Sequence, residues 1–575
     1  MILFEKTFPP ALAGLAETLE AATVETWSFD DSATRRRAEA RLAARGITAR
    51  CRSAYKPLLC AFREEIETAG LTRARITWPR HKDAGPRRFL LESYPLTALF
   101  PAVAFEFTEG AESPDLPRYD LSLIYADGRE VTTSVLAPNR SHPDDAGNTA
   151  LSPCGWLIAD GKATALATEY ETLFHQAMQA IRNADWQAEP YFQELNITAS
   201  LPIADEDLGH GDEIMSLREA LHEDFYFSAL EHFQKRSGRA QGDRRLQPGQ
   251  IVPEIRLGAL ASVRVETRAL DGASVSDHRQ PLETAERALS QVQIAEELTR
   301  IPGARFAARS VAGRPVAAVH HPGSDRAMMI SAGQHANEIS APIGALRAGL
   351  ELAKREGAHF TLSPLENPDG YALHQRLTQD NARHMHHAAR YTALGDDLEY
   401  REGAELYEQA IRREAEARSH ALLHVNLHGY PAHEWTRPLS GYVPRGFEMW
   451  TIPKGFFLVM RHATGWEAPA QALMDQVTRE LGNVPGLADF NAAQIALFER
   501  HAGETGFQML NGFPVLIGQD DRHRVPMTLI TEYPDETIYG DALRAGHAAQ
   551  MATVLAAYAA LQALPAAILP TPLIA

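Results

Sequence analysis

From about residue 285 to the C-terminus, short apolar runs alternate with longer segments whose apolar residues recur every three or four positions. The short runs predict buried strands, and the longer periodic segments predict amphipathic helices. The predicted strands are 305–310, 315–320, 327–331, 359–362, 421–427 and 527–531, and the predicted helices are 284–299, 341–356, 405–420, 469–481 and a long terminal helix. This alternation predicts an α/β fold with a mixed, mostly parallel sheet flanked by helices.

The residues before 285 lack this regular alternation. Helical and strand-like patterns are mixed over 1–200, which predicts an α+β accessory domain. Residues 201–284 combine a helical pattern at 212–234 with a polar linker and a strand, and we treat them as a possible extension of the accessory region. Residues 285–575 form the third unit, the candidate catalytic domain. Adjacent residues of a helix point in different directions, so we expect His222, Glu223 and Asp224 to form an exposed charged turn.

Composition narrows the classes of function. The chain has 575 residues and a net charge of −18, which disfavours nucleic acid or an anionic membrane as its main partner. Three cysteines without close spacing exclude a disulfide scaffold and a thiolate zinc cluster. The chain has no apolar run long enough for a membrane span and no secretory leader pattern, so a cytoplasmic location is expected. The composition is compatible with either a monomer or a homo-oligomer.

Polar side chains suited to catalysis follow three of the predicted strands. His335 and Glu338 lie after the strand 327–331, three residues apart on what would be the first turn of a helix. His428 comes directly after the predicted strand 421–427, and Glu532 comes directly after the predicted strand 527–531. A fourth strand end carries Asn-Pro-Asp-Gly at 367–370, which predicts a turn. Because functional groups in such sheets come from strand ends, these residues are expected to meet at one edge.

With these motifs (QHANE, ENPDGY, NLHGYP and ITEYP), residues 285–565 resemble the zinc carboxypeptidase family, the carboxypeptidase A-like metallopeptidases. The resemblance implies that His335, Glu338 and His428 hold zinc. It also implies that Glu532 is the general acid/base acting on a zinc-activated water to hydrolyse an amide or peptide bond. An arginine after the NPDG motif would polarise the scissile carbonyl. Arg383 has the matching offset, and Arg376 and Arg390 are alternatives.

Other histidines could compete for the third ligand position. His424 lies four residues before His428 on the same strand, and His433 follows on a loop. The cluster of His384, His386 and His387 could suggest a second metal, but we interpret it as cavity lining or surface.

The substrate-binding motif departs from the family. Where an Asn-Arg pair would hold the substrate carboxylate, this chain has Glu399, Tyr400 and Arg401. We expect these three residues to bind substrate, with Arg401 as a bidentate carboxylate clamp. The alternative is that Glu399 and Arg401 pair with each other on the surface. The predicted substrate is a peptide or an acylated amino acid. The alternatives are a deacylase of the aspartoacylase type, which typically has glycine where Ala336 stands, and a non-catalytic binding protein on the same fold.

Overall fold

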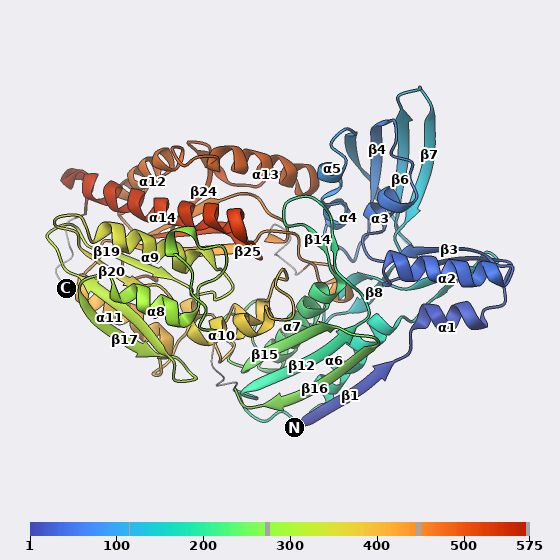
Figure 1. Ribbon diagram of the computed structural model, residues 1–575, viewed down its shortest axis with the longest axis horizontal. Coiled ribbons are helices and arrows are strands. Elements are labelled where there is room, and N and C mark those ends of the chain that lie inside the picture. Colours follow the sequence, from blue (N-terminus) through green and yellow to red (C-terminus); the bar gives the residue numbers. More distant parts are fainter. Residues whose placement is uncertain (114–115, 271–275, 444–449, 571–575) are drawn as a thin grey trace.

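The structure is a computed structural model that describes residues 1–113, 116–270, 276–443 and 450–570 (Figure 1). Its largest element is a nine-stranded sheet in the order β17-β18-β20-β19-β21-β25-β22-β24-β23. The strands are β17 Ala304–Arg309, β18 Pro315–His321, β19 Met328–Ala332, β20 Phe360–Ser363, β21 Leu423–Pro431, β22 Phe457–His462, β23 Gln508–Leu510, β24 Phe513–Gln519 and β25 Met527–Glu536. All of them come from the predicted catalytic region.

The four central strands β20, β19, β21 and β25 run parallel, while β18 and β22 pair antiparallel on either side of them. The prediction of a mixed sheet is therefore confirmed for this region, and four of its eight neighbouring strand pairs are parallel. The sequence pattern missed β22, β24 and β23, which complete the sheet beyond β25. The parallel centre brings the carboxyl ends of β19, β21 and β25 to one edge, where ligands of such sheets bind.

Helices cover both faces of the sheet. On one face, four helices share a hydrophobic core with the central strands. They are α8 Gln291–Thr299, α9 Ser340–Leu352, α12 Glu467–Leu481 and α14 Gly540–Ala563. The helix α11 Ala410–Ser419 packs through Ile411 and Ala415 on the other face. A Cβ at Gly344 would lie 2.4 Å from the Cβ of Gln550. Glycine at this position therefore allows α9 to pack closely against α14.

The motif at 367–370, which was predicted to be a turn, begins a helix. Asn367 accepts a hydrogen bond from the backbone N–H of Gly370, and Pro368 occupies the first position of α10 Pro368–Leu377. An asparagine cap followed by proline is a favourable helix start, because proline lacks only an N–H that would be unpaired there. The remaining helix of this region is α13 Leu487–Ala502.

The region before 285 contains three four-stranded sheets in the orders β1-β16-β12-β15, β11-β10-β2-β3 and β5-β4-β6-β7. Their strands are β1 Ile2–Phe8, β2 Thr23–Ser28, β3 Thr48–Ser53, β4 Leu71–Arg80, β5 Ala104–Glu112, β6 Arg118–Tyr125, β7 Glu130–Leu136, β10 Trp156–Ala159, β11 Lys162–Ala165, β12 Glu194–Leu201, β15 Gln250–Leu257 and β16 Ala261–Arg268. The predicted boundary at residue 200 lies within β12. The sheet around β12 therefore joins the two predicted N-terminal segments.

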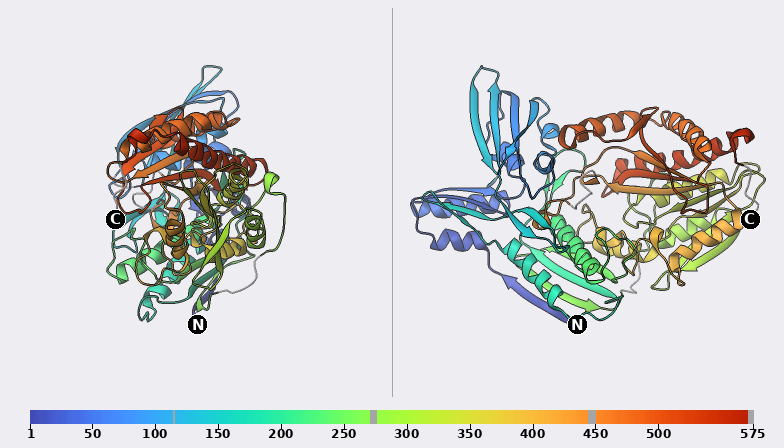
Figure 2. Two further views of the ribbon diagram at one scale, coloured as in Figure 1. Left: turned by 90° about the vertical axis from the view of Figure 1, so that its left-hand side faces the viewer. Right: turned by 180° about the vertical axis from the view of Figure 1, so that it is seen from behind.

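Short strands and helices complete this α+β region, which lies beside the nine-stranded sheet (Figure 2). They are β8 Asn139–Pro143, β9 Thr149–Pro153, β13 Glu206–Asp207, β14 Ile214–Met215, α1 Ala11–Thr18, α2 Ser32–Ala44, α3 Pro57–Glu64, α4 Arg88–Glu92, α5 Leu96–Leu99, α6 Glu169–Asn183 and α7 Leu217–Arg236. Across the described ranges, no helix is long and apolar enough to cross a membrane. Cys51, Cys60 and Cys154 are buried free thiols.

Helix α7 corrects one prediction. His222, Glu223 and Asp224 were expected to be exposed, but they are 2%, 0% and 0% exposed. The acidic face of α7 packs against the catalytic region, where Glu223 contacts His387 and Asp224 binds the backbone N–H of Leu439 at 2.9 Å. A buried carboxylate is stable only with such partners. They lie 164 and 215 residues away in the chain, which local periodicity cannot indicate.

Candidate metal centre

Two neighbouring parallel strands deliver the three candidate ligands. His335 and Glu338 lie on the turn between β19 and α9, and His428 lies near the end of β21. Ala332 of β19 is paired with Leu427 of β21, so both chains reach the sheet edge at the same level. The three side chains therefore converge although 93 residues separate the two histidines.

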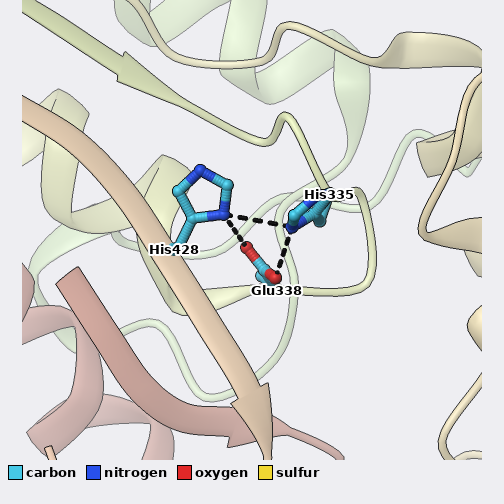
Figure 3. A group of neighbouring side chains, drawn as sticks. All are labelled: His335, Glu338 and His428. Atoms are coloured by element: carbon cyan, nitrogen blue, oxygen red, sulfur yellow. Dashed lines mark hydrogen bonds and ion pairs between the residues drawn. The ribbon is translucent and has the colours of Figure 1, made fainter. Parts of the chain in front are cut away.

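The three side chains of this group point toward one another and could share a cation (Figure 3). Nδ1 of His335 lies 2.8 Å from Oε1 of Glu338, and Nδ1 of His428 lies 3.0 Å from Oε2. The two Nδ1 atoms are only 3.1 Å apart. All three side chains are buried, and Oε2 of Glu338 makes no hydrogen bond within the described residues. Two ring nitrogens and a carboxylate that face one another away from water require a shared cation or protons between them.

Electrostatics keeps the carboxylate of this group ionised. Burial by itself would raise the pKa of Glu338, but His335, His428 and Arg390 lower it below its usual range. Arg390 donates from Nη1 to Oε1 of Glu338 at 2.9 Å. An ionised carboxylate and neutral ring nitrogens are the forms that bind metal.

A second layer of hydrogen bonds orients His335. Its Nε2 lies 3.5 Å from Oδ2 of Asp397, and Oδ1 of Asp397 accepts from the side chain of Gln334 at 2.8 Å. Although burial would raise the pKa of Asp397, His335 and Arg244 lower it below its usual range. Metal-binding histidines commonly direct the other ring nitrogen to a carboxylate, which fixes the tautomer. Sequence reasoning missed Asp397, which lies two residues before Glu399.

Glu532 faces the same cavity as the candidate ligands. It is paired with His428 in the register of β21 and β25. Within the described residues, its carboxyl group has no hydrogen bond or ion pair. Burial and the nearby Glu338 carboxylate raise its pKa well above the usual value, against the opposing effects of Arg390 and Lys454. The carboxyl group of Glu532 therefore has a raised affinity for a proton beside the three converging ligands.

The structure places the candidate arginines differently from the sequence prediction. The side chain of Arg383 is 51% exposed and pairs with Asp207 at 3.4 Å and Asp212 at 3.2 Å, so it does not reach the group. Arg376 pairs with Glu194 at 3.0 Å. Arg390, which contacts Glu338, is the one of the three that lines the cavity. The assignment of Arg383 is therefore corrected to Arg390 as the arginine at this centre.

Of the three residues predicted to bind substrate, the structure places only two at the cavity. Arg401 is 4% exposed, and its guanidinium binds Asp396 at 2.7 Å, together with Glu408 and Thr392. It is not among the residues that line the cavity, because these partners hold it inside the fold. Glu399 and Tyr400 do line the cavity. The carboxylate of Glu399 is paired with Arg412 and lies 3.4 Å from His523.

The competing histidines have other partners. His424 hydrogen-bonds with Ser331 Oγ at 2.7 Å. His433 donates to Glu219 of α7 at 2.8 Å; burial would lower its pKa, but the surrounding carboxylates raise it to about 9. His384 and His386 line a separate cavity. His387 lines the same cavity as Glu532 but contacts Glu223, so in the described chain none of these residues joins the three ligands.

The cavity beside the ligands has a volume of about 410 Å³. Its aromatic lining consists of Phe227, Tyr391, Tyr400, Tyr430, Trp435 and Trp450. Phe227 belongs to α7, and Arg244 from the following loop also lines the cavity. The region before 285 therefore forms part of the cavity wall.

Comparison with known proteins finds no family model and no curated protein that matches the chain. Among solved structures, a metallo-carboxypeptidase from Burkholderia cenocepacia is 13% identical, with 52% of this chain and 75% of that chain covered and a TM-score of 0.30. A metallo-carboxypeptidase from Pseudomonas aeruginosa in complex with (2-guanidinoethylmercapto)succinic acid is 16% identical, with 47% and 69% covered and a TM-score of 0.28. Carboxypeptidase A from Helicoverpa armigera is 10% identical, with 58% and 85% covered and a TM-score of 0.28. At sequence identities this low, the functions of residues in those proteins are not assigned to residues of this chain.

Proposed function

We propose that this protein is a zinc-dependent hydrolase of amide bonds, of the metallocarboxypeptidase type. The observation that carries the proposal is the convergence of two imidazole nitrogens and one carboxylate beside a cavity that also contains Glu532. Two histidines and one glutamate are a ligand set of catalytic zinc sites, which keep a further coordination position open. His335, Glu338 and His428 would hold the ion.

In this proposal, one side chain transfers protons and another stabilises the developing negative charge. When bound, zinc supplies a Lewis acid strong enough to make water lose a proton near neutral pH. Glu532 accepts that proton and later delivers it to the leaving amine, a role suited to a carboxyl group of raised pKa. Arg390 stabilises the negative charge that develops on the carbonyl oxygen. Asp397 holds His335 in its ligating orientation.

The role of Arg390 gives a direct comparison with Arg383. Changing Arg390→Met should lower kcat by on the order of 10²–10³-fold, because one donor to the developing charge is lost. Arg383→Met should retain activity close to wild type, since this side chain pairs with Asp207 and Asp212 away from the cavity. Steady-state kinetics of the two zinc-loaded variants measures the difference. The opposite ranking of the two variants would refute the role of Arg390.

The substrate class can be tested with a defined panel. Zinc-loaded protein should release the C-terminal residue from N-blocked dipeptides, and amine release measures the rate. N-acetyl amino acids in the same panel test the deacylase alternative. Hydrolysis of these compounds alone would replace the peptidase assignment by a deacylase, and hydrolysis of neither class would contradict the proposed function.

We further propose that residues before 285 act as an accessory region that shapes substrate access. Phe227 and Arg244 support this, since both line the cavity from outside the catalytic region.

A further inference from the structure

Two charged side chains of the cavity lack a partner among the described residues: Glu532, which the proposed chemistry uses, and Arg461, which it does not. The cavity's other charged groups are paired, as follows: Arg244 with Asp397, Arg390 with Glu338, Arg522 with Asp520, and Glu399 with Arg412. An arginine that lines a cavity without a counter-ion is a candidate for binding an anion.

Arg461 lies on β22 at a distance from the metal ligands. Because β22 runs antiparallel to β25, Phe457 is paired with Glu532 and Arg461 with Thr528. Side chains alternate along a strand, so Phe457, Val459 and Arg461 are on one face of β22. Four residues along a strand correspond to about 13 Å, which places the backbone of Arg461 at the far end of the cavity from Glu532.

The neighbouring strand leaves room for this guanidinium. Arg461 is paired with Gly518 of β24, and a Cβ at Gly518 would lie 3.1 Å from Nη1 of Arg461. Any larger side chain at 518 would press on the guanidinium. Between Arg461 and the metal ligands, the wall is apolar, formed by Val459, Leu516 and Ile530.

We infer that Arg461 binds a side-chain carboxylate of the residue that the substrate releases, carried a few bonds away from the scissile amide on an apolar stem. This inference rests on the proposed function for the identity of the cavity. The planar guanidinium can hold a carboxylate through two parallel hydrogen bonds. The apolar wall would contact the methylene groups in between. The favoured substrates are therefore peptides whose released residue is acidic, such as glutamate.

Product binding tests the inference without any hydrolysis. Calorimetry with zinc-loaded protein compares L-glutamate with its two amides, glutamine and isoglutamine. Glutamate should bind more tightly than glutamine by on the order of 10–100-fold, the effect of one charge-assisted pair. Weak binding of isoglutamine together with full binding of glutamine would overturn the inference, because it would show that only the α-carboxylate is recognised.

Variants then connect this preference to Arg461. Arg461→Met, which keeps the length and removes the charge, should abolish the preference, and Arg461→Lys should retain part of it. Arg479→Met is the matched control, because that arginine is 66% exposed on α12 and pairs with Asp475. An unchanged preference in Arg461→Met, or no preference in the wild-type protein, would overturn the inference. If glutamate binds as expected but no peptide is cleaved, the inference about Arg461 stands and the proposed hydrolysis fails.

Discussion

Replacing His335 by alanine should remove the bound zinc and reduce amide hydrolysis to background. The remaining pair, Glu338 and His428, cannot enclose a cation, because His335 contributes the nitrogen 2.8 Å from Oε1 and 3.1 Å from the other ring. Zinc sites of this class depend on all three protein ligands. Metal analysis of purified protein should find about one zinc per wild-type chain and near zero in the variant.

The control for this experiment is His321→Ala. His321 lies on β18 and its Nδ1 binds the backbone carbonyl of Pro302 at 2.8 Å, apart from the cavity. This variant should keep both zinc and activity. Thermal unfolding of both variants distinguishes loss of metal from loss of fold. A His335→Ala protein that retains stoichiometric zinc and wild-type turnover would refute the metal centre.

The substitution Glu532→Gln should lower turnover by on the order of 10²–10⁴-fold while leaving zinc in place. Glutamine has nearly the same shape as glutamate but cannot accept or deliver a proton. Glu532 is not one of the three converging ligands, so the metal content should be unchanged. Single-turnover kinetics and metal analysis on the same sample measure both quantities.

Two other outcomes of the Glu532→Gln experiment would change the assignment. Loss of zinc together with activity would identify Glu532 as a ligand or a structural residue. Full turnover would exclude it from the proton transfers. Glu499→Gln, on the exposed side of α13, is the matched control and should behave as the wild-type protein does.

The centre of the nine-stranded sheet could be predicted because its strands are buried on both faces and the helices that cover them are amphipathic. Such segments carry their period in the sequence, as the match between the predicted strand 327–331 and β19 at Met328–Ala332 illustrates. The three candidate ligands could be grouped for a related reason. They follow parallel strands, and parallel strands end at the same edge of a sheet. The structure brings His335, Glu338 and His428 within ligand distance.

The choice of arginine could not be made from the sequence. Arg383 and Arg390 lie in a segment without regular periodicity, so its path depends on distant contacts. The carboxylates of Asp207 and Asp212 hold Arg383, while Glu338 holds Arg390. Spacing along the chain gives no information about such pairings.

The sequence by itself therefore determined the α/β class of the C-terminal region and, through strand ends and the family resemblance, gave a candidate group of metal ligands. Only the tertiary structure decided the environment of the charged groups. It buried Glu223 and Asp224 of α7 against the catalytic region, enclosed Arg401 among its own carboxylate partners, and left Arg461 facing the cavity. Periodicity reports the direction of a side chain relative to its own strand or helix. The energy of a buried charge depends instead on partners brought from elsewhere in the chain.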